Sequence, residues 1–306
     1  MKEQRIVGVD IGGTFVRAGI ADDHNKIILG QTAKSAELFS QGDACENLTA
    51  WLEQLIEKAG CTVSAISLGV PSIINRERTV ILSTPNIRGL DNIPIVQILS
   101  RRFGIPCFLE KDACMLLYND IYQNEIPMNG ILVGIYLGTG IGNEVLISGE
   151  PLIGKNGVAC ELGHIPCVEK REFCTCGNRG CLEVFSSGRA LEKLCAVYYP
   201  DTEIQDIFVK HGKEERILRF VDNLSIPVAT EVNIFDPDHL IIGGGLPAMA
   251  SFPKEWFEAC ILAHSRKPLP AGRLEMIYSR PSQENGIIGA AIYARNKLSM
   301  NGKSIS

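Results

Sequence analysis

One histidine and three cysteines have the residue types and the spacing of a metal site. Nine residues separate His164 from a short stretch that contains Cys174, Cys176 and Cys181. One imidazole and three thiolates are suitable ligands for a tetrahedral Zn²⁺ ion, and two glycines in the stretch let a short loop fold around it. Four protein ligands leave no position for a bound water, so the predicted zinc is structural. The alternative is a surface histidine beside three small buried hydrophobic residues.

Two glycine-rich turns have the composition of phosphate-binding loops. One runs from Asp10 to Thr14 and the other from Gly138 to Gly140, and each follows an apolar run typical of a β-strand. Glycine lets main-chain N–H groups approach a phosphate closely. A carboxylate at such a turn, here Asp10, is explained if Mg²⁺ lies between it and the phosphates. The alternative is that Asp10 and Thr14 only satisfy backbone groups of the turn.

A third glycine cluster, from Gly243 to Gly245, ends an apolar run that begins at Ile241. Three adjacent glycines would allow close approach of a nucleobase or a ribose. Taken alone, the cluster is also consistent with a turn that leads into a helix.

Asp112 lies just after a short strand pattern from Cys107 to Glu110 and precedes a stretch with helical periodicity from Ala113 to Gln123. The pattern therefore predicts a strand that is followed directly by a helix. An aspartate at this junction commonly caps the helix N-terminus, and position alone favours that interpretation. The alternative is a carboxylate that acts as a general base.

The elements that would position these residues follow from the apolar pattern. Residues Val7 to Thr14 can be aligned with Val133 to Gly140 at an offset of 126 residues, with three identities. This internal match predicts two related α/β lobes, each opening with a hairpin whose turn is rich in glycine. The other expected elements are strands at Ile6–Val9, Val16–Ala21, Lys26–Leu29, Ala65–Val70 and Glu144–Ser148, and helices at Asn47–Ala59 and Gly286–Lys297.

Composition limits the classes of protein and partner. The chain has 306 residues, 45% of them hydrophobic, and a net charge of −5 from 30 Lys and Arg against 35 Asp and Glu. These values predict a soluble globular protein of two domains without a nucleic-acid or membrane partner. The charged start and the lack of a long apolar stretch predict a cytoplasmic location. Eleven cysteines, an odd number, are expected to be reduced thiols.

Taken together, these motifs resemble the ROK proteins, a family of sugar kinases and repressors with the actin/hexokinase-like (ribonuclease H-like) fold. The resemblance implies an α/β fold of two lobes with a cleft between them. It places an N-terminal lobe at residues 1–127, a C-terminal lobe with the zinc loop at 128–285, and a last helix at 286–306 that packs back on the first lobe. The matching pieces are Asp10-x-Gly12-Gly13-Thr14, Thr84-Pro85-Asn86, Asp112-Ala113, Leu137-Gly138-Thr139-Gly140-Ile141-Gly142, Glu161-Leu162-Gly163-His164, Cys174-x-Cys176-Gly177-x-x-Gly180-Cys181-Leu182-Glu183, and Asp236-Pro237 with Gly243-Gly244-Gly245.

The same resemblance implies an ATP-dependent kinase that phosphorylates the carbon-6 hydroxyl of a free hexose. In this setting the general-base role of Asp112 is favoured over capping. The zinc loop would hold His164 and Glu183 in place. The residues implied to bind the sugar are Asn86, Lys111, Asp112, Glu161, His164 and Glu183. Those implied to bind Mg²⁺ and ATP are Asp10, Gly12, Gly13, Thr14, Gly138, Thr139 and Gly140 for the phosphates, and Gly243, Gly244 and Gly245 for the adenosine.

The sequence departs from the glucose-using members of the family at three places. Lys111 replaces an asparagine, Cys160 replaces a glycine, and Asn143-Glu144 stand where glycines or apolar residues are usual. A basic residue before the base, together with Ser83-Thr84-Pro85-Asn86, is most similar to the D-allose kinases. D-Allose is therefore the expected substrate, with glucokinase and N-acetylmannosamine kinase as the alternatives.

A member of this family can also be a repressor or an idle sugar sensor. A repressor would carry a helix-turn-helix module before the first phosphate turn, and we expect none because Asp10 lies nine residues from the start. Retention of Asp112 and of both phosphate turns favours a kinase over a sensor that binds a partner. The resemblance also suggests a homodimer.

Overall fold

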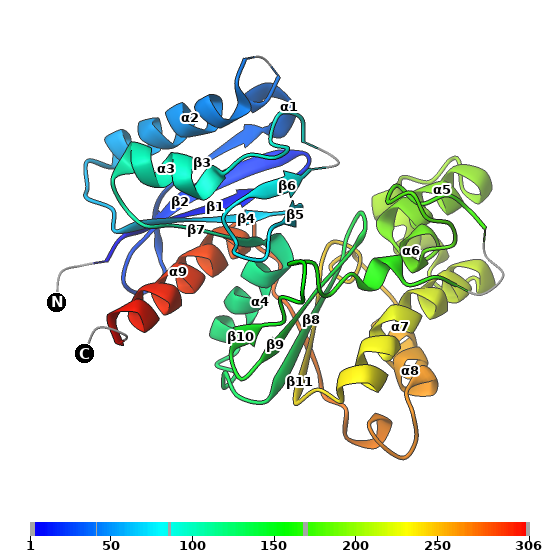
Figure 1. The fold of residues 1–306 in the computed structure, drawn as a ribbon. Coiled ribbons are helices and arrows are strands. Elements are labelled where there is room, and N and C mark those ends of the chain that lie inside the picture. The colour runs from blue at the N-terminus through cyan, green and yellow to red at the C-terminus, as the bar shows by residue number, and fades with distance from the viewer. Residues whose placement is uncertain (1–3, 41, 85–86, 168–170, 304–306) are drawn as a thin grey trace. The chain divides into compact units, whose positions relative to one another are not determined.

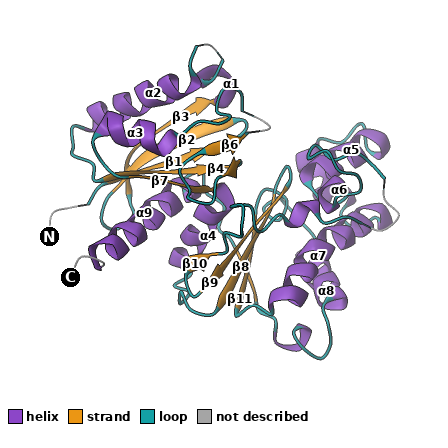
Figure 2. Ribbon diagram, in the orientation of Figure 1, coloured by secondary structure: helices purple, strands orange, loops and turns teal. Residues whose placement is uncertain are grey.

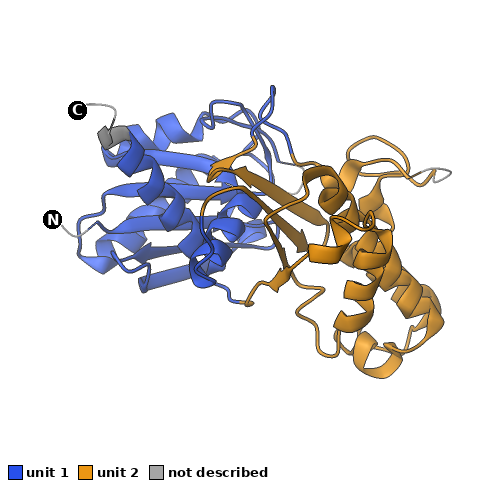
Figure 3. Cartoon of the chain, turned by 90° about the horizontal axis from the view of Figure 1, so that it is seen from below, with its two compact units in different colours: residues 1–127, 153–159, 282–306 blue, residues 128–152, 160–281 orange. Residues whose placement is uncertain are grey.

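The chain divides into two compact units (Figures 1 and 3). The computed structural model describes residues 4–40, 42–84, 87–167 and 171–303. The first unit comprises residues 1–127, 153–159 and 282–306, and the second comprises 128–152 and 160–281. The observed units differ from the expected lobes, because residues 153–159 and 282–285 belong to the first unit. We call residues 153–159 the strap.

The first unit is built on a five-stranded sheet of order β3-β2-β1-β4-β7. Strands β1, β2 and β3 are antiparallel neighbours, whereas β4 and β7 run parallel to β1. All six residues of β4 are buried, as expected for a parallel strand covered on both faces. The strands of this unit are β1 (Ile6–Ile11), β2 (Phe15–Ala21), β3 (Ile27–Lys34), β4 (Ala65–Val70) and β7 (Cys107–Lys111), with a two-stranded ribbon of β5 (Ile73–Ile74) and β6 (Ile81–Ser83).

Helices cover both faces of this sheet (Figures 1 and 2). Helix α2 begins after Asp43, whose side chain accepts hydrogen bonds from two backbone N–H groups, and ends at Gly60 in the left-handed region. On the other face, α9 packs against β1, β4 and α4. A side chain at Gly8 would overlap the carbonyl group of Ile287, so β1 and α9 approach unusually closely. The helices are α1 (Ser35–Leu38), α2 (Ala44–Ala59), α3 (Ile95–Phe103), α4 (Asp112–Gln123) and α9 (Asn285–Lys303).

The second unit repeats the same sheet. Its order is β10-β9-β8-β11-β12, with β8, β9 and β10 antiparallel and with β11 and β12 parallel to β8. The hairpin β8–β9 therefore corresponds to β1–β2, in agreement with the internal match at an offset of 126 residues. The strands are β8 (Ile131–Leu137), β9 (Ile141–Ile147), β10 (Glu150–Pro151), β11 (His239–Gly243) and β12 (Met276–Tyr278).

Helix α7, with α8 packed against it, supplies much of the second core. Its apolar residues, including Phe220, Leu224 and Val228, are buried together with Val133 and Ile135 of β8. Among the described residues, no helix is long and apolar enough to span a membrane. The helices are α5 (Gly188–Tyr198), α6 (Ile207–His211), α7 (Glu215–Phe235) and α8 (Lys254–His264), with short 3₁₀ turns η1 (Leu162–His164), η2 (Leu182–Val184), η3 (Ile204–Asp206) and η4 (Ala271–Arg273).

Candidate active site

Asp112 is the first residue of α4 and follows directly after β7. Its Oδ1 accepts a hydrogen bond from the adjacent backbone N–H of Ala113 at 2.8 Å. A capping aspartate would instead accept from N–H groups two or three residues further along the helix. Burial raises the pKa of the Asp112 carboxyl, and the Ala113 N–H and the Lys111 ammonium oppose that effect. The side chain is thus a partly buried carboxylate whose proton affinity is raised, which suits a general base better than a cap.

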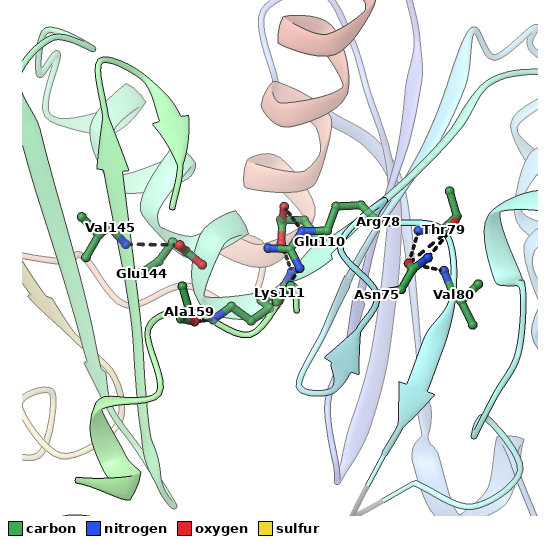
Figure 4. A network of polar contacts seen from close by, with 10 residues as sticks. Asn75, Arg78, Thr79, Val80, Glu110, Lys111, Glu144, Val145 and Ala159 are labelled. Carbon is green, nitrogen blue, oxygen red and sulfur yellow. Dashed lines mark hydrogen bonds and ion pairs between the residues drawn. The ribbon is translucent and has the colours of Figure 1, made fainter. Parts of the chain in front are cut away.

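The end of β7 carries a buried ion pair (Figure 4). Glu110 is fully buried, and its Oε2 lies 3.0 Å from Nε of Arg78. Its Oε1 accepts a hydrogen bond from the backbone N–H of Lys111. Arg78 lies in the loop between β5 and β6 and is only 8% exposed. The two charges therefore join that loop to β7, the strand that ends directly before Asp112.

The strap is attached to the same network within the first unit. Nη1 of Arg78 donates to the carbonyl oxygen of Gly157 at 2.6 Å, and Nζ of Lys111 donates to that of Ala159 at 2.7 Å. Gly157 has φ +83°, and a side chain there would lie 2.7 Å from the carbonyl oxygen of Ile74. The ammonium of Lys111 carries three N–H donors, of which this bond uses one. Lys111 is thus a buried cation that holds the strap, a role that its position in the sequence did not reveal.

The turn between β1 and β2 holds the first glycine cluster. The N–H of Gly12 donates to the carbonyl oxygen of Phe15 at 2.9 Å, so that group closes the turn. Ser35, at the start of α1, donates through Oγ to the Gly12 carbonyl oxygen, and its N–H donates to that of Thr14. Gly13 and Thr14 are exposed at the tip. The structure therefore leaves this tip, rather than Gly12, as the accessible part of the predicted phosphate turn.

Asp10 lies at the end of β1, close to that turn. Burial and the negative charge of Asp112 raise its pKa to about 6, and Arg17, whose Nη1 lies 3.9 Å from Oδ2, acts in the opposite direction. Two carboxylates of the first unit therefore repel each other and share a partly dehydrated environment. Such a pair is a suitable place for a divalent cation, because its charge would relieve the repulsion.

Asp10 is expected to lower stability at neutral pH. The folded protein binds the proton of the Asp10 carboxyl more tightly than the unfolded chain does. The free energy of unfolding therefore falls as the pH rises from 3.8, the ordinary pKa of aspartate, to about 6, the pKa of Asp10 in the folded protein. The side chain of Asp10 is 25% exposed. After allowance for solvent, the loss is at most about 2 kcal/mol. We expect Asp10→Asn to raise the free energy of unfolding above about pH 7 and to change it little near pH 4. Urea titrations at the two pH values measure the free energy of unfolding of both proteins. An equal change caused by Asp10→Asn at both pH values would contradict the prediction.

The four predicted metal ligands come together in the second unit. The ligand atoms of His164, Cys174, Cys176 and Cys181 all lie within 4.8 Å of one another. Cys174 Sγ lies 3.6 Å from His164 Nδ1, and Cys176 Sγ lies 3.6 Å from Cys181 Sγ. Tetrahedral Zn²⁺ requires edges of about 3.6–3.8 Å between such atoms. The donor set and these two separations fit zinc.

His164 presents its two ring nitrogens to different neighbours. Nδ1 faces the thiol of Cys174, whereas Nε2 lies 3.8 Å from Oε2 of Glu161. A metal bound through Nδ1 leaves the proton on Nε2, which orients the ring toward a hydrogen-bond acceptor. Glu161 directly precedes η1 and His164 is its last residue, and both side chains are accessible, with exposures of 48% and 32%. A metal bound at this cluster would therefore fix His164, which is one of two adjacent polar side chains that are accessible to solvent.

The second glycine turn is occupied in part by Glu183. Oε2 of Glu183 accepts a hydrogen bond from the N–H of Ile141 at 3.1 Å, and a side chain at Gly140 would overlap the Glu183 carboxylate. Glu183 is in η2, two residues after the ligand Cys181. Glycine at position 140 therefore makes room for this carboxylate, in addition to any role toward phosphate.

The remaining part of the second turn is joined to α5. The N–H groups of Gly188 and Arg189 donate to the carbonyl oxygens of Gly138 and Thr139, and the N–H of Gly138 donates to the carbonyl oxygen of Gly140. No described atom beyond its chain neighbours lies within 4 Å of a side chain built at Gly138. This turn thus keeps one open face at Gly138, where a ligand could approach the backbone.

The third glycine cluster is explained mainly by packing. A side chain at Gly244, whose φ is +97°, would lie 2.5 Å from backbone atoms of Leu137, and one at Gly243 would lie 2.8 Å from the ring of Tyr136. Only at Gly245 is the corresponding space empty of described atoms. The alternative of a helix entry is wrong, since α8 does not begin until Lys254.

The structure places the predicted residues in two sets. The first unit contains Lys111, Asp112 and the first glycine turn. The second unit contains Glu161, Glu183, the four predicted metal ligands, among them His164, and the other two glycine clusters. Asn86 lies outside the described residues.

The sequence did not reveal the roles of Arg78 and Glu110, because residues in a polar loop and at the charged end of a strand look like surface residues in a sequence. The only available signal was the run of three charges from Glu110 to Asp112.

Cys160 has a backbone conformation that glycine adopts more readily than other residues. Its φ is +64°, in the left-handed region, which costs a side chain roughly 1–2 kcal/mol. The residue lies between the strap and Glu161. A glycine is therefore the residue that this position would accommodate without backbone strain.

Two α/β units with the same strand order and a Cys₃His loop define a class of duplicated α/β proteins, and comparison with known proteins gives the family. The sequence profile of the ROK family matches residues 6–297, so the chain belongs to the ROK family. A glucokinase from Thermotoga maritima is 26% identical over 97% of this chain and 99% of its own. An N-acetyl-D-glucosamine kinase from Pectobacterium atrosepticum is 28% identical, with 93% and 97% covered.

A solved structure, the ROK hexokinase from Thermus thermophilus, is 29% identical to this chain and superposes with a TM-score of 0.76. The match covers 96% of this chain and 99% of that protein. The predicted two-lobed actin/hexokinase-like fold class is thereby confirmed.

Proposed function

We propose that this chain is an ATP-dependent hexose kinase that transfers the γ-phosphoryl group to the carbon-6 hydroxyl of a free aldohexose. Asp112 carries the proposal, because it is a partly buried carboxylate of raised proton affinity at the end of a sheet strand. Membership of the ROK family and the named activities of the relatives support a sugar kinase.

In this proposal Asp112 accepts the proton of the hydroxyl as the phosphoryl group is transferred. A sugar hydroxyl is a weak nucleophile, and a carboxylate within hydrogen-bond reach removes its proton as the new P–O bond forms. Little other covalent chemistry is needed, because positioning and charge stabilisation dominate phosphoryl transfer. Glu161, His164 and Glu183 would bind sugar hydroxyls, and the proton on Nε2 of His164 would serve as a donor.

The nucleotide would be bound by backbone groups at the glycine turns. The N–H groups of Gly12 and Gly138 already donate within their own turns, so the phosphate donors are expected among Gly13, Thr14, Thr139 and Gly140. Gly245 is the member of the third cluster with space for adenosine. Mg²⁺ would neutralise phosphate charge beside Asp10, whose pKa of about 6 reflects burial and the nearby charge of Asp112.

Zinc is proposed as a structural ion at the Cys₃His cluster. When bound, it would fix the loop that carries His164 and Glu183. We expect about one zinc per chain, and we expect Cys176→Ser to lose the metal and to lower the melting temperature, because Cys176 is the exposed ligand. Cys61→Ser, a change at a partly exposed cysteine outside the cluster, is the matched control. Elemental analysis and thermal melts give both readouts, and equal zinc contents in the two variants would contradict the assignment.

D-Allose is the finer proposal for the substrate. It rests on Lys111 and on the stretch Ser83 to Asn86, whereas the two relatives above are named for glucose and for N-acetyl-D-glucosamine. Lys111 donates to the strap, so its effect on the sugar would come partly from the position that it gives to neighbouring backbone.

A panel of sugars tests the function and the substrate together. Sugar-dependent ADP release would be measured with D-allose, D-glucose, N-acetylmannosamine and N-acetylglucosamine, and kcat/KM compared. The largest kcat/KM is expected for D-allose. A much larger value for glucose would remove the allose assignment and leave the kinase, whereas sugar binding without turnover for every sugar would identify a sensor.

A further inference from the structure

Two buried polar residues in the second unit support the turn that begins after Glu161. Asn143 of β9 is 2% exposed and Glu231 of α7 is 5% exposed. Nδ2 of Asn143 donates to Oε1 of Glu231 at 3.0 Å, and Oδ1 of Asn143 accepts from the backbone N–H of Leu162 at 3.1 Å. One side-chain amide therefore joins a strand, a helix and the 3₁₀ turn η1.

This hydrogen-bond chain has a fixed direction. A carboxylate oxygen only accepts, so the NH₂ group of Asn143 must face Glu231, and the amide oxygen must then face the N–H of Leu162. Burial raises the pKa of Glu231 to about 7, and the carbonyl oxygen of the protonated acid accepts in the same way. The N–H of Leu162 favours the same orientation, because the flipped amide would place two donors against each other there and two acceptors against each other at Glu231. Glu231 thus reinforces the orientation that holds η1 and anchors the amide on its other side.

The backbone of η1 transmits this constraint to the polar side chains beside it. Leu162 is its first residue and is buried, and the N–H of His164 donates to the carbonyl oxygen of Glu161 at 3.0 Å. Both β9 and α7 pack against η1. Fixing the N–H of Leu162 therefore fixes the segment from which the side chains of Glu161 and His164 extend.

Burying Asn143 and Glu231 in the core of the second unit opposes folding. Among the described residues, Oε2 of Glu231 is buried with no hydrogen-bond partner. Burying an unsatisfied carboxyl oxygen opposes folding, and apolar side chains at 143 and 231 would fill the space without that cost. A role in orienting η1 explains why polar residues occupy these positions.

We propose that Asn143 and Glu231 are positioning residues that hold the Glu161–His164 segment in its sugar-binding geometry. The role of that segment rests on the proposed function. Neither residue touches the reacting groups, and both act through the backbone N–H of Leu162.

The kinetic test uses four variants. Asn143→Ala and Glu231→Ala should each raise KM for the sugar about tenfold, as expected for loss of one buried hydrogen bond, and leave KM for MgATP unchanged. Glu231→Gln should keep the wild-type KM for the sugar, because its amide oxygen still accepts from Asn143. Ser225→Ala is the matched control, since Ser225 is a buried polar residue of the same helix whose hydroxyl donates within that helix.

Hydrogen–deuterium exchange of the Leu162 amide provides a readout that does not depend on turnover. Faster exchange is expected in Asn143→Ala and Glu231→Ala, but not in Glu231→Gln or Ser225→Ala. Equal effects of Glu231→Gln and Glu231→Ala, or unchanged exchange in Asn143→Ala, would overturn the proposal. If the wild-type chain lacked sugar-dependent turnover while the variants showed this exchange pattern, the proposed kinase activity would be refuted and the hydrogen-bond chain confirmed.

Discussion

Asp112→Asn is expected to lower kcat by roughly 10²–10⁴-fold, because an amide cannot accept the proton of the sugar hydroxyl. Sugar affinity should change little, since asparagine has nearly the same shape and its NH₂ group can donate to the oxygen of the sugar hydroxyl. Oδ1 of Asp112 accepts from the adjacent N–H of Ala113, and an amide oxygen can do the same, so the exchange should not disturb α4. Steady-state kinetics and calorimetric titration with the sugar measure the two quantities.

A surface aspartate provides the control for this exchange. Asp206→Asn removes an acid that forms an exposed pair with Lys210, at 3.1 Å, and should leave kcat unchanged. An Asp112→Asn variant with wild-type kcat would refute the general-base role. A variant that lost sugar affinity and turnover equally would instead identify Asp112 as a binding residue.

The second large effect, a loss of folding stability, is expected when Arg78 is replaced. Arg78→Met leaves Glu110 buried without its ionic partner and leaves the carbonyl oxygen of Gly157 without its donor. Breaking a buried pair on one side costs about 3–5 kcal/mol, and protonation of Glu110 favours the lower end of that range. We therefore expect the free energy of unfolding to fall by about 3 kcal/mol, as measured by urea titration.

An exposed ion pair allows a matched comparison. Arg102 is paired with Glu53 at the surface, and Arg102→Met should cost less than about 1 kcal/mol. The double change Arg78→Met with Glu110→Leu should recover part of the stability, because it removes the unpaired charge. If the two arginine variants lost equal stability, the network at the end of β7 would have no special importance.

Much of the fold could be predicted from local sequence. The apolar run of β1 ends at the first glycine turn, and the same pattern recurs in β8, so the duplicated hairpin was visible as a repeat. The metal ligands were found because a histidine and three cysteines at such short spacing are typical of a metal site. The position of Asp112 at the change from strand to helix could be predicted, whereas its proposed role as a base came from the resemblance to the ROK family, because position alone favoured a helix cap. In each case neighbours in the sequence determine the local structure.

Contacts between distant segments could not be predicted in this way. Arg78 and Glu110 are 32 residues apart, and Asn143 and Glu231 are 88 residues apart. Their pairing depends on which elements pack together, and polar residues of this kind resemble surface residues in the sequence. The same reason applies to Gly140, whose missing side chain is needed because Glu183, far along the chain, occupies that place. The homodimer and the cytoplasmic location stay predictions.

The most direct test of the central claim is to identify the phosphorylated product. ³¹P NMR of the purified chain with MgATP and D-allose or D-glucose would follow ATP, ADP, inorganic phosphate and sugar phosphate in one sample. We predict that ADP and a hexose 6-phosphate appear in equal amounts and only when sugar is present. Release of inorganic phosphate in place of a sugar phosphate, or ATP that persists with every hexose, would contradict it.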